Sequence, residues 1–326
     1  MNDLQVLWLI HKGDGYVGAP QTQYGFEQKV AELCDCKFAG EGWPLYRAEE
    51  TLDQTVKRVM PNADWVIDRD NALHEKKPTD RSYRIGHFIS DLHAKHYYKL
   101  RNPVKYVEAL NDTEYDAVFM RYPLIHGTKF RPEVVYDRLK CEKHWVPWSV
   151  DTERYHPRRR KRYDVSFMGT VGACYPLRKE IWENIYYVAR GHRILRQRAP
   201  AGKTYDRAVS KLQDEFLVGK DYRKALGETR ILLFGCSVYR YALQKFFEGS
   251  ASGCLVVSDA PGMAKRLGFR DKETYVKVDS FDWEDTVKEL LDNPDMVEQV
   301  ARRGRHNVME NHTHKVRARQ FVEMLI

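Results

Sequence analysis

The chain lacks any long uninterrupted hydrophobic run. None of its 326 residues belongs to a stretch near the roughly 20 apolar residues that a membrane-spanning helix needs. Its start, MNDLQVLWLI, carries Asp3 and only a short apolar run, which is not the pattern of a secretory signal peptide. The sequence therefore predicts a cytoplasmic protein with no transmembrane segment.

Cysteine is scarce and poorly spaced for metal binding. The chain has six cysteines and no CxxC pair, and Cys34 and Cys36 alone make a poor zinc site. Low-complexity segments and internal repeats are also lacking, which excludes a repeat protein. Several cysteines fall in strand-like runs, where a free buried thiol is the expected role.

The sequence does contain short apolar runs that alternate with helical patterns. Strands are expected at 5–10, 64–67, 83–90, 115–120, 144–147, 163–169, 230–235, 254–259 and 274–279. Helices are expected at about 21–33, at 175–189 and over most of 282–325, with a break near Asn311. Continuous apolar strands between helices indicate an α/β fold with parallel sheets covered on both faces.

A boundary between two domains is expected between Trp148 and Arg162, where Pro157 and a block of basic residues occur. We place the domains at 1–155 and 156–326, each Rossmann-like. Such domains bind ligands beyond the carboxyl ends of their strands, so a cleft between them is the expected ligand site.

A glycine-rich loop follows the first expected strand. The segment from Gly13 through Asp14 and Gly15 to Gly18 matches GxGxxG, the dinucleotide-binding pattern. In that pattern the third glycine lies inside a helix, whereas Pro20 here favours a helix that begins later. The alternatives are a loop that faces a ligand in the cleft, a plain long loop, or a site for NAD or FAD.

Two further strands are followed by acidic residues. Asp68-Arg69-Asp70 resembles a metal-holding DxD, but a solvated loop is the favoured interpretation. Asp91 and His93 end the next strand, where a carboxylate and an imidazole suit acid–base catalysis or contact with a sugar. A helix cap at Ser90 or Asp91 is the alternative.

The strand at 163–169 leads into a second glycine loop. Gly169, Thr170 and Gly172 precede a helix that starts at Pro176, an arrangement that favours anion binding. Arg178 follows one turn later, and its guanidinium suits a phosphate. The alternative is a surface arginine on an amphipathic helix.

Glu248 stands in FFEGSASGCLVVSD, among small residues that let a helix pack closely on the strand that follows. A buried carboxylate without a partner is costly. Either a ligand accounts for it, such as the two hydroxyls of a ribose, or Glu248 pairs with Arg240 or Lys245 on its own helix.

These segments together resemble the GT-B glycosyltransferases of the "glycosyl transferases group 1" family, which includes spore-maturation-type transferases. The likeness rests on YDVSFMGTVG, FFEGSASGCLVVSD, EYDAVFMRYP, HWVPWSVDTERYHP and the closing segment from Asp292 to Phe321. It covers most of residues 80–326.

The resemblance implies transfer of a sugar from a nucleotide-diphosphate sugar to a hydroxyl acceptor between two Rossmann-like domains that face a central cleft. It implies that Glu248 binds the ribose and that the loop around Gly169 binds the diphosphate. The last helix, about 312–326, is expected to pack on the first domain. It implies no cofactor and no metal, with a UDP-sugar as co-substrate. Many members carry a second glutamate where this chain has Arg240, which instead becomes a candidate for the diphosphate.

The net charge of +8 favours anionic partners. The densest block is Arg158, Arg159, Arg160, Lys161 and Arg162, and its interpretations are a solvated linker, an anionic membrane surface or a nucleic-acid backbone. Two other functions stay open: a non-catalytic nucleic-acid-binding protein on a transferase fold, and an NAD-linked oxidoreductase.

Overall fold

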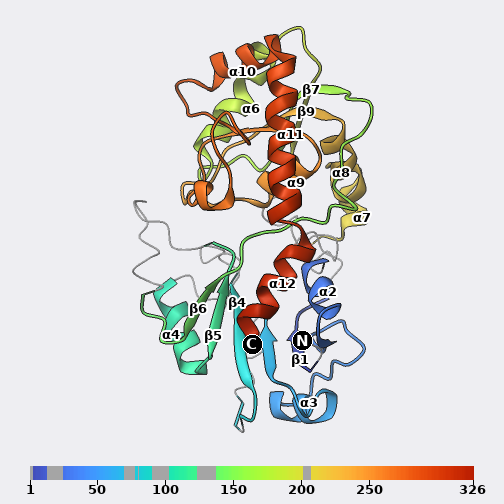
Figure 1. The fold of residues 1–326 in the computed structure, drawn as a ribbon, viewed down its shortest axis with the longest axis vertical. Helices are drawn as coiled ribbons and strands as arrows, with labels where there is room; N and C mark the ends of the chain where they lie inside the picture. Colours follow the sequence, from blue (N-terminus) through green and yellow to red (C-terminus); the bar gives the residue numbers. More distant parts are fainter. Residues whose placement is uncertain are drawn as a thin grey trace. The chain divides into compact units, whose positions relative to one another are not determined.

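The computed structural model describes residues 3–12, 25–69, 78–79, 81–89, 103–122, 137–200 and 207–326. They form two compact units (Figure 1). The first unit holds the described residues up to Pro147 together with Arg317–Ile326, and the second holds Trp148–Val316.

The first unit is built on a six-stranded parallel sheet. Its strands, β1 (Gln5–Leu9), β2 (Asp35–Phe38), β3 (Trp65–Asp68), β4 (Arg84–Ile89), β5 (Ala117–Met120) and β6 (Glu142–Trp145), take the order β2-β1-β3-β4-β5-β6. Helices α2 (Gly25–Ala31), α3 (Leu52–Val59) and α4 (Pro103–Thr113) connect them. The sheet thus has the helix-connected parallel form that the apolar runs predicted.

Alternate residues of these strands point to opposite faces, and each face has its own core. On one face Leu7 and Leu9 pack with residues of α3 and α4. On the other face Trp8 packs with α2 and with α12 (His314–Leu325), whose Phe321 lies 5.6 Å from the Trp8 ring. The final helix therefore completes the core of the first unit.

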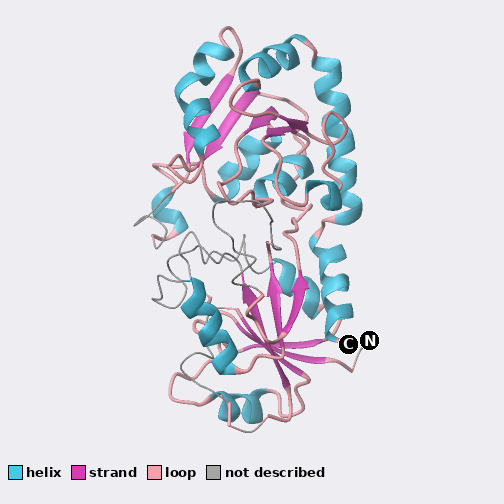
Figure 2. Ribbon diagram, turned by 90° about the vertical axis from the view of Figure 1, so that its left-hand side faces the viewer, coloured by secondary structure: helices cyan, strands magenta, loops and turns pink. Residues whose placement is uncertain are grey.

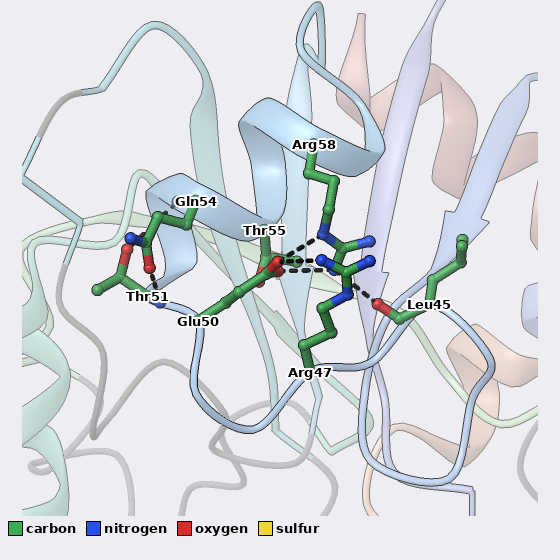
Figure 3. A network of polar contacts seen from close by, with 7 residues as sticks. All are labelled: Leu45, Arg47, Glu50, Thr51, Gln54, Thr55 and Arg58. Atoms are coloured by element: carbon green, nitrogen blue, oxygen red, sulfur yellow. Dashed lines mark hydrogen bonds and ion pairs between the residues drawn. The ribbon is translucent and has the colours of Figure 1, made fainter.

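A polar network fixes the start of α3 (Figure 3). Thr51 and Gln54 form a reciprocal capping box at its first turn. Beside it, Glu50 accepts two hydrogen bonds of 2.6 Å from Arg58 and one of 3.1 Å from Thr55. The hydrogen bonds from Arg58 lower the pKa of the Glu50 carboxyl to about 2.

The second unit contains a five-stranded parallel sheet, drawn in magenta with the first in Figure 2. Its strands, β7 (Tyr163–Gly169), β8 (Ile194–Arg198), β9 (Thr229–Leu233), β10 (Leu255–Ser258) and β11 (Val276–Lys277), take the order β11-β10-β9-β7-β8. The helices are α6 (Pro176–Val188), α7 (Val209–Leu212), α8 (Gly219–Gly227), α9 (Gln244–Ala251), α10 (Trp283–Asp292) and α11 (Pro294–Asn311). A 3-10 turn, η3, covers Ala264–Leu267.

Close packing of α9 on the sheet explains the small residues of this helix. A Cβ atom on Gly249 would lie 2.6 Å from Leu232 Cδ2 and 3.1 Å from Val256 Cγ2, so only glycine allows this approach. Leu232 belongs to β9 and Val256 to β10. The expected close packing of helix and strand is confirmed.

The expected α/β class and the expected strands are confirmed, with shifts of one or two residues at their ends. Strands β2 and β8 were not anticipated. Both lie at sheet edges and none of their residues is fully buried, so neither reads as an apolar run.

Candidate functional site

The loops that follow β7 and β9 meet at the carboxyl edge of the second sheet. The amide of Val238 donates to the carbonyl of Cys174 at 2.8 Å, which ties the two loops together. The amide of Cys236 donates to Asp259, directly after β10, at 2.5 Å. This is the edge where parallel α/β sheets bind ligands.

Arg178 lies buried between these loops. Its Nε donates to the carbonyl of Gly235 at 2.6 Å and its Nη1 donates to the carbonyl of Thr170 at 3.2 Å. Its guanidinium also stacks over the ring of Tyr175 at 3.7 Å. The alternative of a surface arginine is therefore wrong: Arg178 joins both loops and brings its positive charge beneath them.

A second cation reaches the same point from α9. A Cβ atom built on Gly169, the last residue of β7, would lie 3.5 Å from Arg178 Nη1 and 3.6 Å from Lys245 Cε. Burial lowers the pKa of Lys245 to about 8, opposed by Glu248 and assisted by Arg178. The Arg178 guanidinium and the last methylene of the Lys245 side chain thus flank the end of a strand where a side chain is lacking, and their two positive charges favour an anion there.

Glu248 is buried and has protein partners. The hydroxyl of Tyr222, on α8, donates to Glu248 Oε2 at 3.0 Å, and Tyr155 also hydrogen-bonds to this carboxylate. The pKa of Glu248 is raised, because burial outweighs the lowering by Lys245 and by the hydrogen bonds from the two tyrosines. Charge and hydrogen bonds inside the second unit therefore offset part of the cost of burying this carboxylate.

The hydroxyl of Tyr222 links Lys245 to Glu248. Lys245 Nζ donates to the Tyr222 hydroxyl at 3.1 Å, and that hydroxyl donates in turn to Glu248. From the sequence, Lys245 was expected only to form a salt bridge with Glu248, which lies three residues away. Tyr222 gave no signal in the sequence, since it lies 26 residues from Glu248 on another helix.

The other expected diphosphate residues occupy different positions. Gly172 is exposed, and a Cβ atom there would meet no heavy atom within 4 Å. Arg240 is exposed, has a left-handed backbone with φ of 55°, and its carbonyl accepts from Gly262 at 2.6 Å.

Several expected residues lie outside the described part of the chain. They include Asp91 and His93, expected to be catalytic, and the cleft loop with Gly13, Asp14 and Gly15.

The expectation of a solvated loop at Asp68-Arg69-Asp70 is wrong for Asp68 and Arg69, whereas Asp70 lies outside the described residues. Both side chains are buried in the first unit. Asp68 accepts from the Tyr115 hydroxyl at 2.7 Å and lies 3.1 Å from His87 Nδ1, and Arg69 forms an ion pair with Glu27. Asp68 therefore belongs to a polar network inside the core.

The residues of the basic block before β7 differ in their exposure to solvent. Lys161 turns inward, and its Nζ donates to the carbonyls of Gly227 and Thr229 at 2.9 Å each. Burial lowers its pKa. Lys161 is therefore a structural lysine and is not presented to a partner, whereas Arg158, Arg159 and Arg160 are exposed.

Part of the chain matches a family of known proteins. Residues 187–323 match the model of a family described as "Glycosyl transferase-like", and nearly all of that match lies in the second unit. No curated protein sequence matches the chain.

Solved structures of glycosyltransferases share the whole fold. Sucrose-phosphate synthase from Thermosynechococcus elongatus has a TM-score of 0.64 at 12% identity, covering 99% of this chain and 98% of its own. HepE of Anabaena, solved with UDP-glucose, has a TM-score of 0.64 at 10% identity, covering 99% of both chains. A glycosyltransferase of Rickettsia africae has a TM-score of 0.60 at 12% identity, covering 100% of this chain and 98% of its own.

The chain therefore has the GT-B fold of glycosyltransferases, as the resemblance predicted. The narrower likeness to spore-maturation-type transferases stays a prediction. Within the part of the chain that the structure describes, no helix is both long enough and apolar enough to cross a membrane.

Proposed function

We propose that this protein transfers a hexosyl or pentosyl group from a nucleotide-diphosphate sugar to a hydroxyl acceptor. The observation that carries the proposal is the convergence of Arg178 and Lys245 at Gly169, with Glu248 connected to Lys245 through Tyr222. The second unit would hold the donor, and the first would supply the acceptor side.

The diphosphate belongs beside Gly169 in this proposal. The carboxyl end of β7 carries no side chain there, so phosphate oxygens can approach both Arg178 and Lys245. When the sugar bond breaks, negative charge grows on the leaving diphosphate, and preorganised cations stabilise it. These side chains supply positive charge without a metal ion, so we propose that transfer is independent of metal and cofactor. Thr170 and Gly172 complete the loop.

The ribose belongs beside Glu248. A carboxylate accepts hydrogen bonds from two neighbouring hydroxyls, and Tyr155 and Tyr222 hold this one in place. HepE was solved with UDP-glucose, which makes UDP the first nucleotide to test. Asp91 or His93 remains the proposed base, on the sequence alone.

A thermal-shift panel of UDP, GDP, ADP, CMP, NAD and their sugars tests the proposal on the full chain. A ligand at 100 times its dissociation constant stabilises the folded state by about 2.7 kcal/mol, which a melting curve shows clearly. We expect one nucleoside diphosphate, with UDP first, to raise the melting temperature. Stabilisation by NAD alone would contradict the proposal and favour an oxidoreductase.

A further inference from the structure

The amino edge of the second sheet, opposite the edge that carries Gly169, presents a concentration of arginines. Arg193 precedes β8, Arg230 lies in β9 and Arg162 precedes β7, so all three stand where neighbouring parallel strands begin. Arg158 joins them, because its amide donates to the carbonyl of Gly227, just before β9, at 3.0 Å. With Arg159 and Arg160 they form what we call the arginine surface.

The acidic partners of these arginines lie underneath them. Asp164 pairs with Arg193 at 2.6 Å and with Arg230 at 3.7 Å, and Glu228 pairs with Arg162 at 3.5 Å. The side chains of Asp164 and Glu228 are only 19% and 12% exposed, whereas those of the three arginines are 45–54% exposed. The outer layer is therefore cationic, and the two carboxylates do not neutralise its six guanidinium groups.

Aromatic side chains extend this surface toward the sheet edge. The guanidinium of Arg196, on edge strand β8, lies 4.3 Å from the Trp182 ring and 4.4 Å from the Tyr186 ring. Arg198 lies 4.7 Å from the Trp182 ring. Tyr187, on the last turns of α6, is 74% exposed. Arg196 and Arg198 thus stack on aromatic rings of α6, and Tyr187 offers an exposed ring near the end of the same helix.

We propose that the arginine surface and Tyr187 bind single-stranded nucleic acid. Guanidinium groups pair with phosphates, and exposed rings stack with bases, which is the combination that single strands require. A bilayer fits less well, because an interfacial anchor buries tryptophan, phenylalanine or leucine side chains beside its cations. The exposed rings on α6 belong to Tyr186 and Tyr187. Since the surface and Gly169 lie at opposite edges of one sheet, the two kinds of ligand should bind independently.

Fluorescence anisotropy with an oligothymidylate of about 20 nucleotides, longer than the site of one binding module, tests the proposal. If six arginines meet phosphates, log K should fall against log salt with a slope of about −4. Removing Arg158, Arg159 and Arg160 together by alanine substitution should reduce the slope to about −2. Tyr187→Ala should weaken binding about tenfold without changing the slope.

A matched control removes equal charge elsewhere: the triple change Arg270→Ala, Arg302→Ala and Arg303→Ala should leave affinity and slope unchanged. Saturating UDP should also leave the affinity for the oligonucleotide unchanged. Binding of UDP is measured in a separate titration, so the proposed donor site and the proposed nucleic-acid surface can each be disproved without the other. Absence of oligonucleotide binding, equal losses in both triple variants, or tighter binding to vesicles of anionic phospholipid than to the oligonucleotide would overturn the inference.

Discussion

Lys245 Nζ lies 3.1 Å from the hydroxyl of Tyr222, which lies 3.0 Å from the carboxylate of Glu248. Lys245 flanks Gly169, and Glu248 is the proposed ribose ligand. Tyr222 thus connects the proposed phosphate position with the proposed ribose position. A change at either end should be felt at the other, because coupled hydrogen bonds in a buried network do not act independently.

Gly169→Ala should abolish or strongly weaken binding of nucleoside diphosphate while leaving the fold intact. The new methyl group would lie at ordinary contact distance, 3.5 Å from Arg178 Nη1 and 3.6 Å from Lys245 Cε, so the protein tolerates it. It would occupy the space where a phosphate oxygen meets both cations. Calorimetric titration with UDP measures the loss, and a melting curve checks the fold.

Gly172→Ala is the matched control in the same loop. A Cβ atom there meets nothing within 4 Å, so UDP affinity should stay within about twofold of wild type, since nothing is displaced. Equal losses in the two variants would show that the loop as a whole, and not the space beside Gly169, governs binding.

UDP affinity should fall as the pH rises above about 8. The pKa of Lys245 is lowered to about 8, so its ammonium is charged below that pH and progressively neutral above it. The charged form binds the diphosphate, so affinity should approach a tenfold loss per pH unit above the pKa, until the pKa of the complex is reached. Titrations between pH 7 and pH 10 measure this.

Two variants separate Lys245 from other titrating groups. Lys245→Arg keeps a charge that does not titrate in this range, so the loss above pH 8 should disappear. Lys245→Met should bind weakly at every pH and show no such loss. A wild-type slope that persists in Lys245→Met would assign the titration to another residue.

Lys161→Met should destabilise the fold, whereas Arg160→Met should not. Lys161 Nζ donates to the carbonyls of Gly227 and Thr229 at 2.9 Å each, and the loss of both hydrogen bonds should cost about 1–3 kcal/mol, although the Gly227 carbonyl keeps the Arg158 amide as a donor. Arg160 is exposed, so its replacement should change stability by less than about 0.5 kcal/mol. Urea unfolding of both variants makes the comparison, and equal stabilities would remove Lys161 from its structural role.

Arg58→Leu should lower the melting temperature at pH 7, and the difference from wild type should vanish in acid. The folded-state pKa of Glu50 is about 2, below its ordinary 4.5, so the stabilisation is complete above 4.5 and is lost as the pH falls toward 2. Arg47→Leu is the control, since Arg47 is half-exposed and contacts Glu50 only at 3.3 Å. A difference independent of pH would indicate lost packing instead.

The sequence predicts most readily the strands whose residues are buried. Strands β9 and β10 read as apolar runs because both faces of their sheet are covered. Strand β8, with the sequence ILRQR, is an edge strand whose arginines stack on α6, so its residues carry no apolar pattern. Such a strand forms because of tertiary stacking, and a local sequence pattern does not contain that information.

Some residues of the candidate site gave a signal in the sequence, whereas their contacts did not. Gly169 after a strand and Glu248 among small residues could both be singled out from the sequence. Close approach of the backbone and burial restrict which residue types can occur at such positions. Arg178 donates to the carbonyl of Gly235, which lies 57 residues away, and Lys245 reaches Gly169. Both contacts join segments that are distant in the sequence and that only the strand order of the sheet brings together.

The most direct test is a calorimetric titration of UDP into the wild-type protein and into Glu248→Ala. Loss of a charge-assisted contact of about 1.5–3 kcal/mol should weaken UDP binding roughly 10- to 100-fold. Because Tyr155 and Tyr222 also bond to Glu248, a melting curve must first show that the variant is folded. The predicted loss would place the ribose at Glu248, whereas unchanged affinity in a folded variant would contradict the proposed donor site.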